Sequence, residues 1–345
     1  EEEMPAEEMQ IQGEILVLLG LLEEGQDLRS ILLDLYAEQV VGFYDTEAEQ
    51  LFVARDQAEM GPLEEITFVH EYTHALQDQY FDLHAFLSEN SPNSDSDLAR
   101  MALAEGDATA VEAAYILKTF SMTEALKLLA ETDSLQTEKF DAAPRFLQKT
   151  LLFPYEAGFA FVNTFESFAD LNGAYADPPQ STEQVLHPEA YWLRDEPQEI
   201  GLSPVAKALE PDWVEYDRDV WGELYTRIYL ETFIDEGAAA EAAMGWGGDQ
   251  YLYLKDAAGR KLFILYSAWD STTDADEFWG ACLVLQSMDR GGWTTQGDGA
   301  AVPWEARDHW NFFVKHSADR TLLIISEDKT IFSRIISALS EFDGN

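Results

Sequence analysis

Residues 67–76 read Thr67-Phe68-Val69-His70-Glu71-Tyr72-Thr73-His74-Ala75-Leu76. They contain the pattern His-Glu-x-x-His, in which His70 and His74 are four residues apart. Residues with this spacing lie on one face of an α-helix, so both imidazoles can point at one zinc ion. Glu71 lies beside them and is suited to act as a general base. Because the chain has only six His in 345 residues, chance would give this pattern on the order of 0.01 times. We therefore interpret it as a zinc site rather than as a helix with two surface imidazoles.

A catalytic zinc ion needs a third protein ligand and an open position. Tyr80 stands where the metzincin pattern requires a third His, which excludes that pattern. We favour Glu105 over a merely solvated acid, because it lies in the apolar stretch Ala102-Leu103-Ala104-Glu105-Gly106-Asp107-Ala108. Gly106 is expected to let this second helix approach the first one closely. His84 is a further possibility, and as a fourth ligand it would point to a structural site instead.

The periodicity of the chain predicts an α+β fold. A mostly helical domain over residues 11–244 is expected to carry the zinc site and a small antiparallel sheet, formed by strands over 40–45 and 50–54. The zinc helix is expected to run from Pro62 to about residue 83, because proline suits the first helical position. Another helix is expected to open at Pro154 and to run through Phe168.

Three further stretches complete the predicted organisation. Residues 1–10 are mostly acidic and are expected to form a loose stub. Residues 195–215 are predicted to be rich in loops. Residues 245–345 read as strand-strand-helix twice, which predicts a carboxy-terminal α+β domain in which two such units share one sheet.

The composition is strongly acidic. The chain has 21 Lys and Arg against 66 Asp and Glu, a formal net charge of −45. Such a surface repels phosphate backbones, so we expect no nucleic-acid partner. It is typical both of proteins kept soluble in high salt and of acidic secreted proteins.

The expected location is extracellular or at the cell surface. The apolar run over residues 15–22 is too short to span a bilayer, so no transmembrane segment is expected in this chain. The opening Glu1-Glu2-Glu3, which lacks a Met, suggests a trimmed or mature form, and this is compatible with the earlier loss of an export signal or anchor. Cys282 is the only cysteine, which excludes an internal disulfide and a cysteine-rich zinc site.

The pattern formed by His70, Glu71 and His74 with a downstream Glu105 resembles the gluzincin metallopeptidases. The segment Phe153-Pro154-Tyr155-Glu156-Ala157-Gly158-Phe159-Ala160 resembles the Pro-Tyr-Glu-Lys-Gly-Phe segment of the M1 aminopeptidase and leukotriene A4 hydrolase group. This resemblance implies that Tyr155 donates a hydrogen bond to the oxyanion. A wider resemblance, to uncharacterised bacterial and haloarchaeal surface proteins described as zinc peptidases, includes Ser181-Thr182-Glu183-Gln184 and Gly245-Trp246-Gly247-Gly248-Asp249.

The chain also departs from those families. The Gly-Ala-Met-Glu-Asn element that binds a free amino terminus in M1 enzymes is absent, which argues against aminopeptidase specificity. Thr109 stands where thermolysin-like enzymes have an Asp that steadies a ligand His. Asp78 or Asp107 is a candidate for that role. His187 is a candidate substrate contact, with a loop His bonded to the backbone as the alternative.

The function predicted from these features is zinc-dependent hydrolysis of a peptide or protein substrate. Glu71 is the predicted base and Tyr155 the predicted oxyanion donor. One alternative is a non-catalytic surface or binding protein with a structural zinc ion between two helices. Another is a zinc hydrolase of a non-peptide amide or an epoxide. Neither the specificity nor the oligomeric state follows from the sequence.

Overall fold

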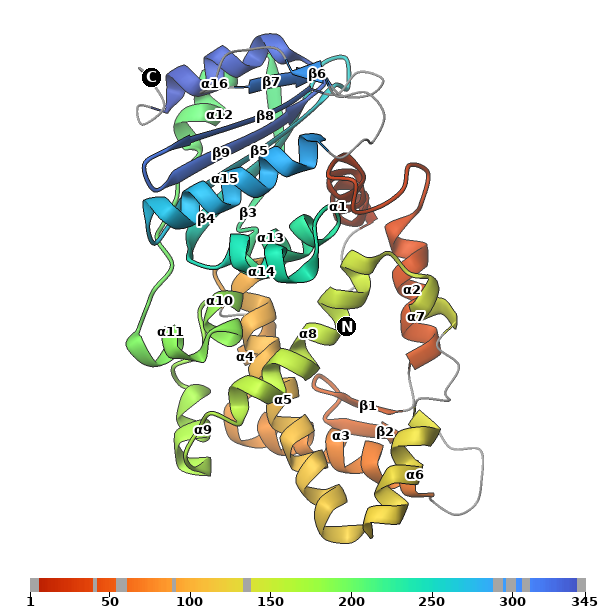
Figure 1. The fold of residues 1–345 in the computed structure, drawn as a ribbon. Coiled ribbons are helices and arrows are strands. Elements are labelled where there is room, and N and C mark those ends of the chain that lie inside the picture. Colours follow the sequence, from red (N-terminus) through yellow and green to blue (C-terminus); the bar gives the residue numbers. More distant parts are fainter. Residues whose placement is uncertain are drawn as a thin grey trace. The chain divides into compact units, whose positions relative to one another are not determined.

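The protein is described by a computed structural model that covers residues 6–39, 42–53, 61–88, 91–132, 138–287, 294–295, 302–305 and 311–339. It has the predicted α+β fold and divides into two compact units (Figure 1). The helical unit comprises residues 29–195, and the sheet unit comprises residues 1–28 and 196–345. This division does not coincide with the predicted boundary at residue 244, because residues 213–219 form a strand that pairs with the first predicted strand of the carboxy-terminal sheet.

The helical unit consists of helices and one antiparallel hairpin. Its elements are α2 (Leu28–Gln39), β1 (Gly42–Asp45), β2 (Gln50–Val53), α3 (Pro62–Phe81), α4 (Leu83–Ser88), α5 (Ser94–Thr119), α6 (Met122–Thr132), α7 (Glu138–Ala142), α8 (Arg145–Val162), α9 (Phe168–Ala174), α10 (Thr182–Leu186) and α11 (Pro188–Leu193).

Helix α3, which carries the His-Glu motif, begins and ends as its sequence dictates. Pro62 occupies the first turn, where its missing N–H costs nothing, and Glu64 and Glu65 favour the positive end of the helix dipole. The helix ends because Asp82 adopts a left-handed conformation with φ of 54°. The predicted hairpin is present and packs on α3. A Cβ atom on Gly42 would lie 2.9 Å from both Thr67 Cγ2 and the carbonyl oxygen of Phe52, so a larger residue would crowd β1 between α3 and β2.

Two glycines allow α5 and α8 to cross with their backbones in contact. A Cβ on Gly106 would lie 2.3 Å from the carbonyl carbon of Gly158, and a Cβ on Gly158 would lie 2.1 Å from the carbonyl oxygen of Ala102. Gly106 therefore serves the contact with α8, and not the predicted close approach to α3. The expectation that a helix opens at Pro154 is also wrong, because α8 already begins at Arg145 and Pro154 lies inside it.

The sheet unit contains a seven-stranded antiparallel sheet with the order β3-β4-β5-β9-β8-β7-β6. Its elements are α1 (Ala6–Leu18), α12 (Ser203–Leu209), β3 (Trp213–Asp219), α13 (Gly222–Glu231), α14 (Glu236–Ala243), β4 (Trp246–Asp256), β5 (Lys261–Trp269), α15 (Thr272–Ser287), β6 (Thr294–Thr295), β7 (Val302–Glu305), β8 (Asn311–Ser317), β9 (Arg320–Ser326), the 3-10 turn η1 (Lys329–Ile331) and α16 (Phe332–Ala338).

The two predicted strand-strand-helix units are β4-β5-α15 and β8-β9-α16, and they meet where β5 pairs with β9. Helices α12 and α16 lie on one face of the sheet and α15 on the other (Figure 1). Leu262 and Ile264 face α12 and α16, whereas Trp269 points to the opposite face and stacks on Phe278 of α15 at 4.9 Å. Because both faces are covered, β5 is apolar along most of its length.

The segments Ser181-Thr182-Glu183-Gln184 and Gly245-Trp246-Gly247-Gly248-Asp249 have structural roles. Ser181 caps α10, and the Thr182 N–H and hydroxyl bond the buried Asp95. Asp249 accepts hydrogen bonds from the Trp246 indole and from the N–H groups of Trp221 and Gly222. These contacts anchor short helices rather than form a site.

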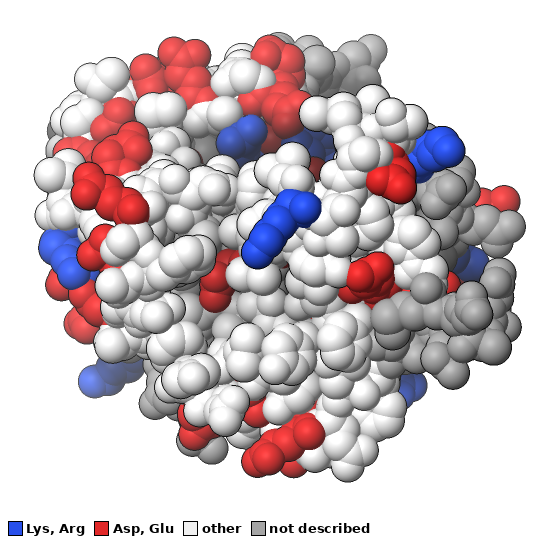
Figure 2. Space-filling model, turned by 90° about the horizontal axis from the view of Figure 1, so that it is seen from below, with Lys and Arg blue, Asp and Glu red and all other residues white. Residues whose placement is uncertain are grey.

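Residues 6–10 belong to α1 and are not part of a loose stub, whereas residues 1–5 lie outside the described residues. Helix α1 is held on the sheet by Glu14, which accepts a hydrogen bond from Tyr253 at 2.6 Å and pairs with Lys255 at 2.7 Å. Within the described parts of the chain, no helix combines the length and apolar character needed to cross a bilayer. Figure 2 shows acidic residues in several groups, with a few basic residues and many uncharged ones between them.

Candidate metal centre

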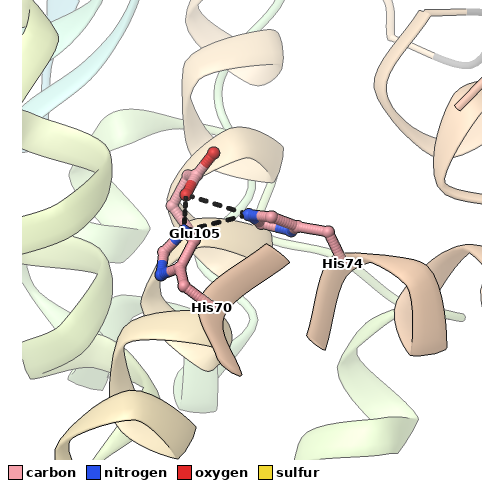
Figure 3. A group of neighbouring side chains, drawn as sticks. All are labelled: His70, His74 and Glu105. Carbon is pink, nitrogen blue, oxygen red and sulfur yellow. Dashed lines mark hydrogen bonds and ion pairs between the residues drawn. The ribbon is translucent and has the colours of Figure 1, made fainter. Parts of the chain in front are cut away.

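Helices α3 and α5 bring the three predicted metal ligands together. The Nε2 atom of His70 lies 3.1 Å from Glu105 Oε2 and 3.1 Å from His74 Nε2, and His74 Nε2 lies 3.3 Å from Glu105 Oε2 (Figure 3). Within the described residues, these three form the group of His, Cys and acidic side chains whose ligand atoms converge closely enough to hold one metal ion. The His-Glu motif alone supplies two of the ligands, and α5 supplies the third.

The spacing of these atoms fits a zinc ion. Tetrahedral zinc binds nitrogen and oxygen at about 2.0–2.1 Å, which places neighbouring ligand atoms about 3.3–3.4 Å apart. The three observed separations of 3.1–3.3 Å are close to that value. Two imidazoles and one carboxylate are also a donor set that suits catalytic zinc, for which three protein ligands leave one position open.

The charge states of the two imidazoles and of Glu105 depend on one another. Burial favours a lower pKa for His70, but its hydrogen bonds with Glu105 and Glu112 raise the pKa to about 10. Burial likewise opposes ionisation of Glu105, but hydrogen bonds with His70 and His74 lower its pKa to about 2. Glu105 is therefore held as a carboxylate, the form that binds metals, whereas His70 must release its proton before it can bind one.

Glu71 lies beside the ligands without being one of them. Its side chain lies against the hairpin, where the backbone N–H of Tyr44 interacts favourably with the carboxylate. Burial raises the pKa of Glu71 above its usual range, although the two nearby imidazoles oppose the shift. A half-buried carboxyl with a raised pKa has the character of a general base that can later return its proton.

Tyr155 on α8 reaches the same site. Its ring centre lies 6.2 Å from that of His70, and its hydroxyl lies near enough to Glu105 to interact with that carboxylate. Burial, together with the charges of Glu105 and Glu71, raises the pKa of this hydroxyl. Tyr155 therefore stays protonated and can donate a hydrogen bond, although 43% of the residue is exposed.

The Nδ1 atoms of the two His contact residues that are not among the predicted site residues. Nδ1 of His70 lies 3.3 Å from Glu112 Oε2, and Nδ1 of His74 lies 2.8 Å from the Oε1 of Gln77. Helical spacing could have indicated both, because Gln77 lies three residues after His74 and Glu112 seven residues after Glu105. The predicted Asp107 reaches His74 only through Gln77, whose Nε2 donates to it at 3.0 Å.

The other candidates lie elsewhere in the helical unit. Asp78 accepts hydrogen bonds from the Tyr44 hydroxyl and from the Leu83 N–H, so it ties the hairpin to α3 rather than orienting a ligand. Asp78 and His84 line an open groove of about 1270 Å³ between the hairpin and the outer face of α3. His187 lies at the junction of α10 and α11, where its backbone N–H bonds Glu183.

A family described as "Domain of unknown function (DUF8575)" matches residues 211–335. The match covers most of the sheet unit and none of the residues of the metal centre. No curated protein and no solved structure matches the chain.

Proposed function

We propose that the protein is a zinc-dependent peptidase of the gluzincin type, with His70, His74 and Glu105 as metal ligands. The observation that carries this proposal is the convergence of the three ligand atoms to separations of 3.1–3.3 Å, with Glu71 and Tyr155 beside them. A purely structural zinc site would need neither a carboxyl of raised pKa nor an unionised phenol next to the ligands.

The side chains divide the proposed reaction between them. A zinc ion, when bound, supplies a Lewis acid that polarises a carbonyl and lowers the pKa of water. Glu71 accepts the proton of the attacking water on its carboxylate and later delivers it to the leaving amine. The Tyr155 hydroxyl donates a hydrogen bond to the oxyanion, a contact typically worth about 2.7–4 kcal/mol in the transition state.

The test uses the zinc-loaded chain and an unstructured protein substrate such as unfolded casein. We expect cleavage by the wild type, no cleavage by Glu71→Gln, and bound zinc in both. Glu64→Gln, on the same helix, is the matched control and should cleave like the wild type. Full activity in Glu71→Gln would eliminate Glu71 as the base.

The role of Tyr155 is tested separately. Tyr155→Phe keeps the ring but removes the donor, so we expect turnover to fall about 10²–10³-fold while KM changes little. Tyr72→Phe, on the exposed side of α3, is the control. An unchanged turnover number would show that Tyr155 does not serve the oxyanion.

The same assays separate the alternatives. Bound zinc without turnover on any peptide, together with loss of folding on chelation, would support a structural zinc ion. Turnover of small amides or epoxides without peptide cleavage would support a hydrolase of non-peptide substrates.

A further inference from the structure

Gln77 is a buried polar side chain that faces the metal centre. It is only 2% exposed, yet it carries two donor hydrogens and an acceptor oxygen. Its Nε2 lies 2.9 Å from the carbonyl oxygen of Ala104 and 3.0 Å from Asp107 Oδ2, and its Oε1 lies 2.8 Å from His74 Nδ1. The amide is therefore fully hydrogen-bonded.

These partners permit only one orientation of the amide. A carbonyl and a carboxylate can accept hydrogen bonds but cannot donate them, so the NH₂ group of Gln77 must face Ala104 and Asp107. In the reverse orientation, the Gln77 oxygen would face two acceptors in a buried place, and the hydrogen bonds with both would be lost. The oxygen of Gln77 is consequently fixed towards His74.

The fixed amide determines the tautomer of His74. Because Oε1 only accepts, Nδ1 of His74 must carry a hydrogen and donate it. In the neutral ring, the free electron pair then lies on Nε2, the atom that points at His70 Nε2 and Glu105 Oε2. This is the form in which an imidazole binds a metal through Nε2.

Asp107 is itself held in place by Tyr175. The Tyr175 hydroxyl donates to Asp107 Oδ2 at 3.0 Å, and its ring stacks on Phe81 at 4.1 Å with an interplanar angle of 4°. The chain of contacts therefore runs from a stacked ring, through a carboxylate and an amide, to a metal ligand.

We propose that Gln77, Asp107 and Tyr175 form a positioning network that holds His74 in its metal-binding tautomer. The direct partner of the imidazole in this network is an amide oxygen rather than a carboxylate. This inference rests on the proposed zinc site, but it concerns metal affinity and not the reaction.

The experiment measures zinc binding to the full chain after removal of metal by a chelator, with a chromophoric chelator as competitor. Gln77→Met keeps the length of the side chain and removes its hydrogen bonds, so we expect zinc to bind about 10–100-fold more weakly. Tyr175→Phe keeps the stack on Phe81 and removes one donor to Asp107, so we expect a loss of up to about tenfold.

Two control variants make the same chemical changes outside the network. Gln79→Met alters an exposed glutamine on α3, and Tyr191→Phe removes a hydroxyl that bonds the carbonyl of Asp177. Both should bind zinc within about twofold of the wild type. The visible absorption of bound Co²⁺ is the second readout, because a displaced His74 changes the ligand field, whereas a general loss of stability does not.

The outcomes separate the two proposals. Wild-type affinity and an unaltered Co²⁺ spectrum in Tyr175→Phe and in folded Gln77→Met would overturn the positioning network, whatever the activity. Zinc binding that depends on the network, without peptide cleavage, would leave the network standing and reject the peptidase. If Gln77→Met does not fold, Tyr175→Phe still decides the question.

Discussion

The crossing of α5 and α8 provides the sharpest test of the architecture, because an alanine there should reverse its usual effect. In an open helical position, Gly→Ala stabilises a protein by up to about 1 kcal/mol. In Gly158→Ala, however, the new Cβ would lie 2.1 Å from the carbonyl oxygen of Ala102, whereas ordinary contacts begin near 3.4 Å. The helices must therefore separate by about 1 Å, and overpacking of this kind typically costs about 1–3 kcal/mol. Because both contacting groups are backbone, we expect a net loss of about 2 kcal/mol.

The measurement is urea denaturation of the wild type and Gly158→Ala, with Gly173→Ala as control. Gly173 lies in the same unit, and a Cβ added to it would meet none of the described atoms within 4 Å, so that variant should be neutral or slightly more stable. A second readout concerns Tyr155, which lies three residues before Gly158 on α8. Displacement by 1 Å can cost about 10²-fold in turnover, while zinc affinity should persist because the ligands lie on α3 and α5. Equal or greater stability of Gly158→Ala would refute the close crossing.

Three other perturbations have expected outcomes. Burial tends to raise the pKa of Glu14, but hydrogen bonds from Lys255 and Tyr253 lower it from 4.5 to about 2. The ionised Glu14 side chain therefore contributes its full stabilisation above pH 4.5, and this stabilisation is lost as the pH falls through 2. Allowing for solvent screening, Glu14→Gln should lower the free energy of unfolding by about 1–2 kcal/mol at pH 7. Urea titrations should show this difference between the variant and the wild type shrinking between pH 4.5 and 2. A difference that does not change with pH would contradict the pairing. Asp95→Ala leaves the two donors of Thr182 without their acceptor, which should cost about 1–3 kcal/mol in the same assay; no loss would mean that this link is dispensable. Zinc at 100 times its Kd should raise the free energy of unfolding by about 2.7 kcal/mol, and a thermal melt that zinc does not change would argue against a metal site.

The convergence of the three candidate metal ligands could be predicted because each is marked by its local sequence. His70 and His74 share a helical face by spacing alone, and Glu105 was marked by its apolar neighbours. Their supporting partners were not predicted, although Gln77 and Glu112 follow from the same helical spacing once the ligands are fixed. The link through Tyr175 could not be foreseen, since it depends on where α9 ends relative to α5.

The errors have physical causes as well. Gly106 cannot serve the contact with α3, because Glu105 already faces α3 and the next residue lies about 100° further around the helix. The local preference of Pro154 for the first turn of a helix predicts a helix start at that residue. Burial of Phe146, Leu147 and Phe161 along α8 outweighs the hydrogen bond that the proline removes.

The sequence pattern does not predict strand β3, and the reason is different. It lies at the edge of the sheet, and its residues 214–216 are exposed. An edge strand with charged residues lacks the apolar run that identified β5. The edge strands of a sheet are thus harder to predict than its central strands. Because β3 is not predicted, the predicted domain boundary falls at residue 244 instead of near residue 196.

The family match and the proposed chemistry concern different parts of the chain. The matched region covers residues 211–335, whereas the ligands, Glu71, Tyr155 and the positioning network all lie between residues 29 and 195. Proteins that share only the matched region therefore need not contain a metal centre. A relative of the peptidase proposed here must instead have the ligand triad together with two small residues at the crossing of α5 and α8, because without that crossing Tyr155 cannot approach Glu105.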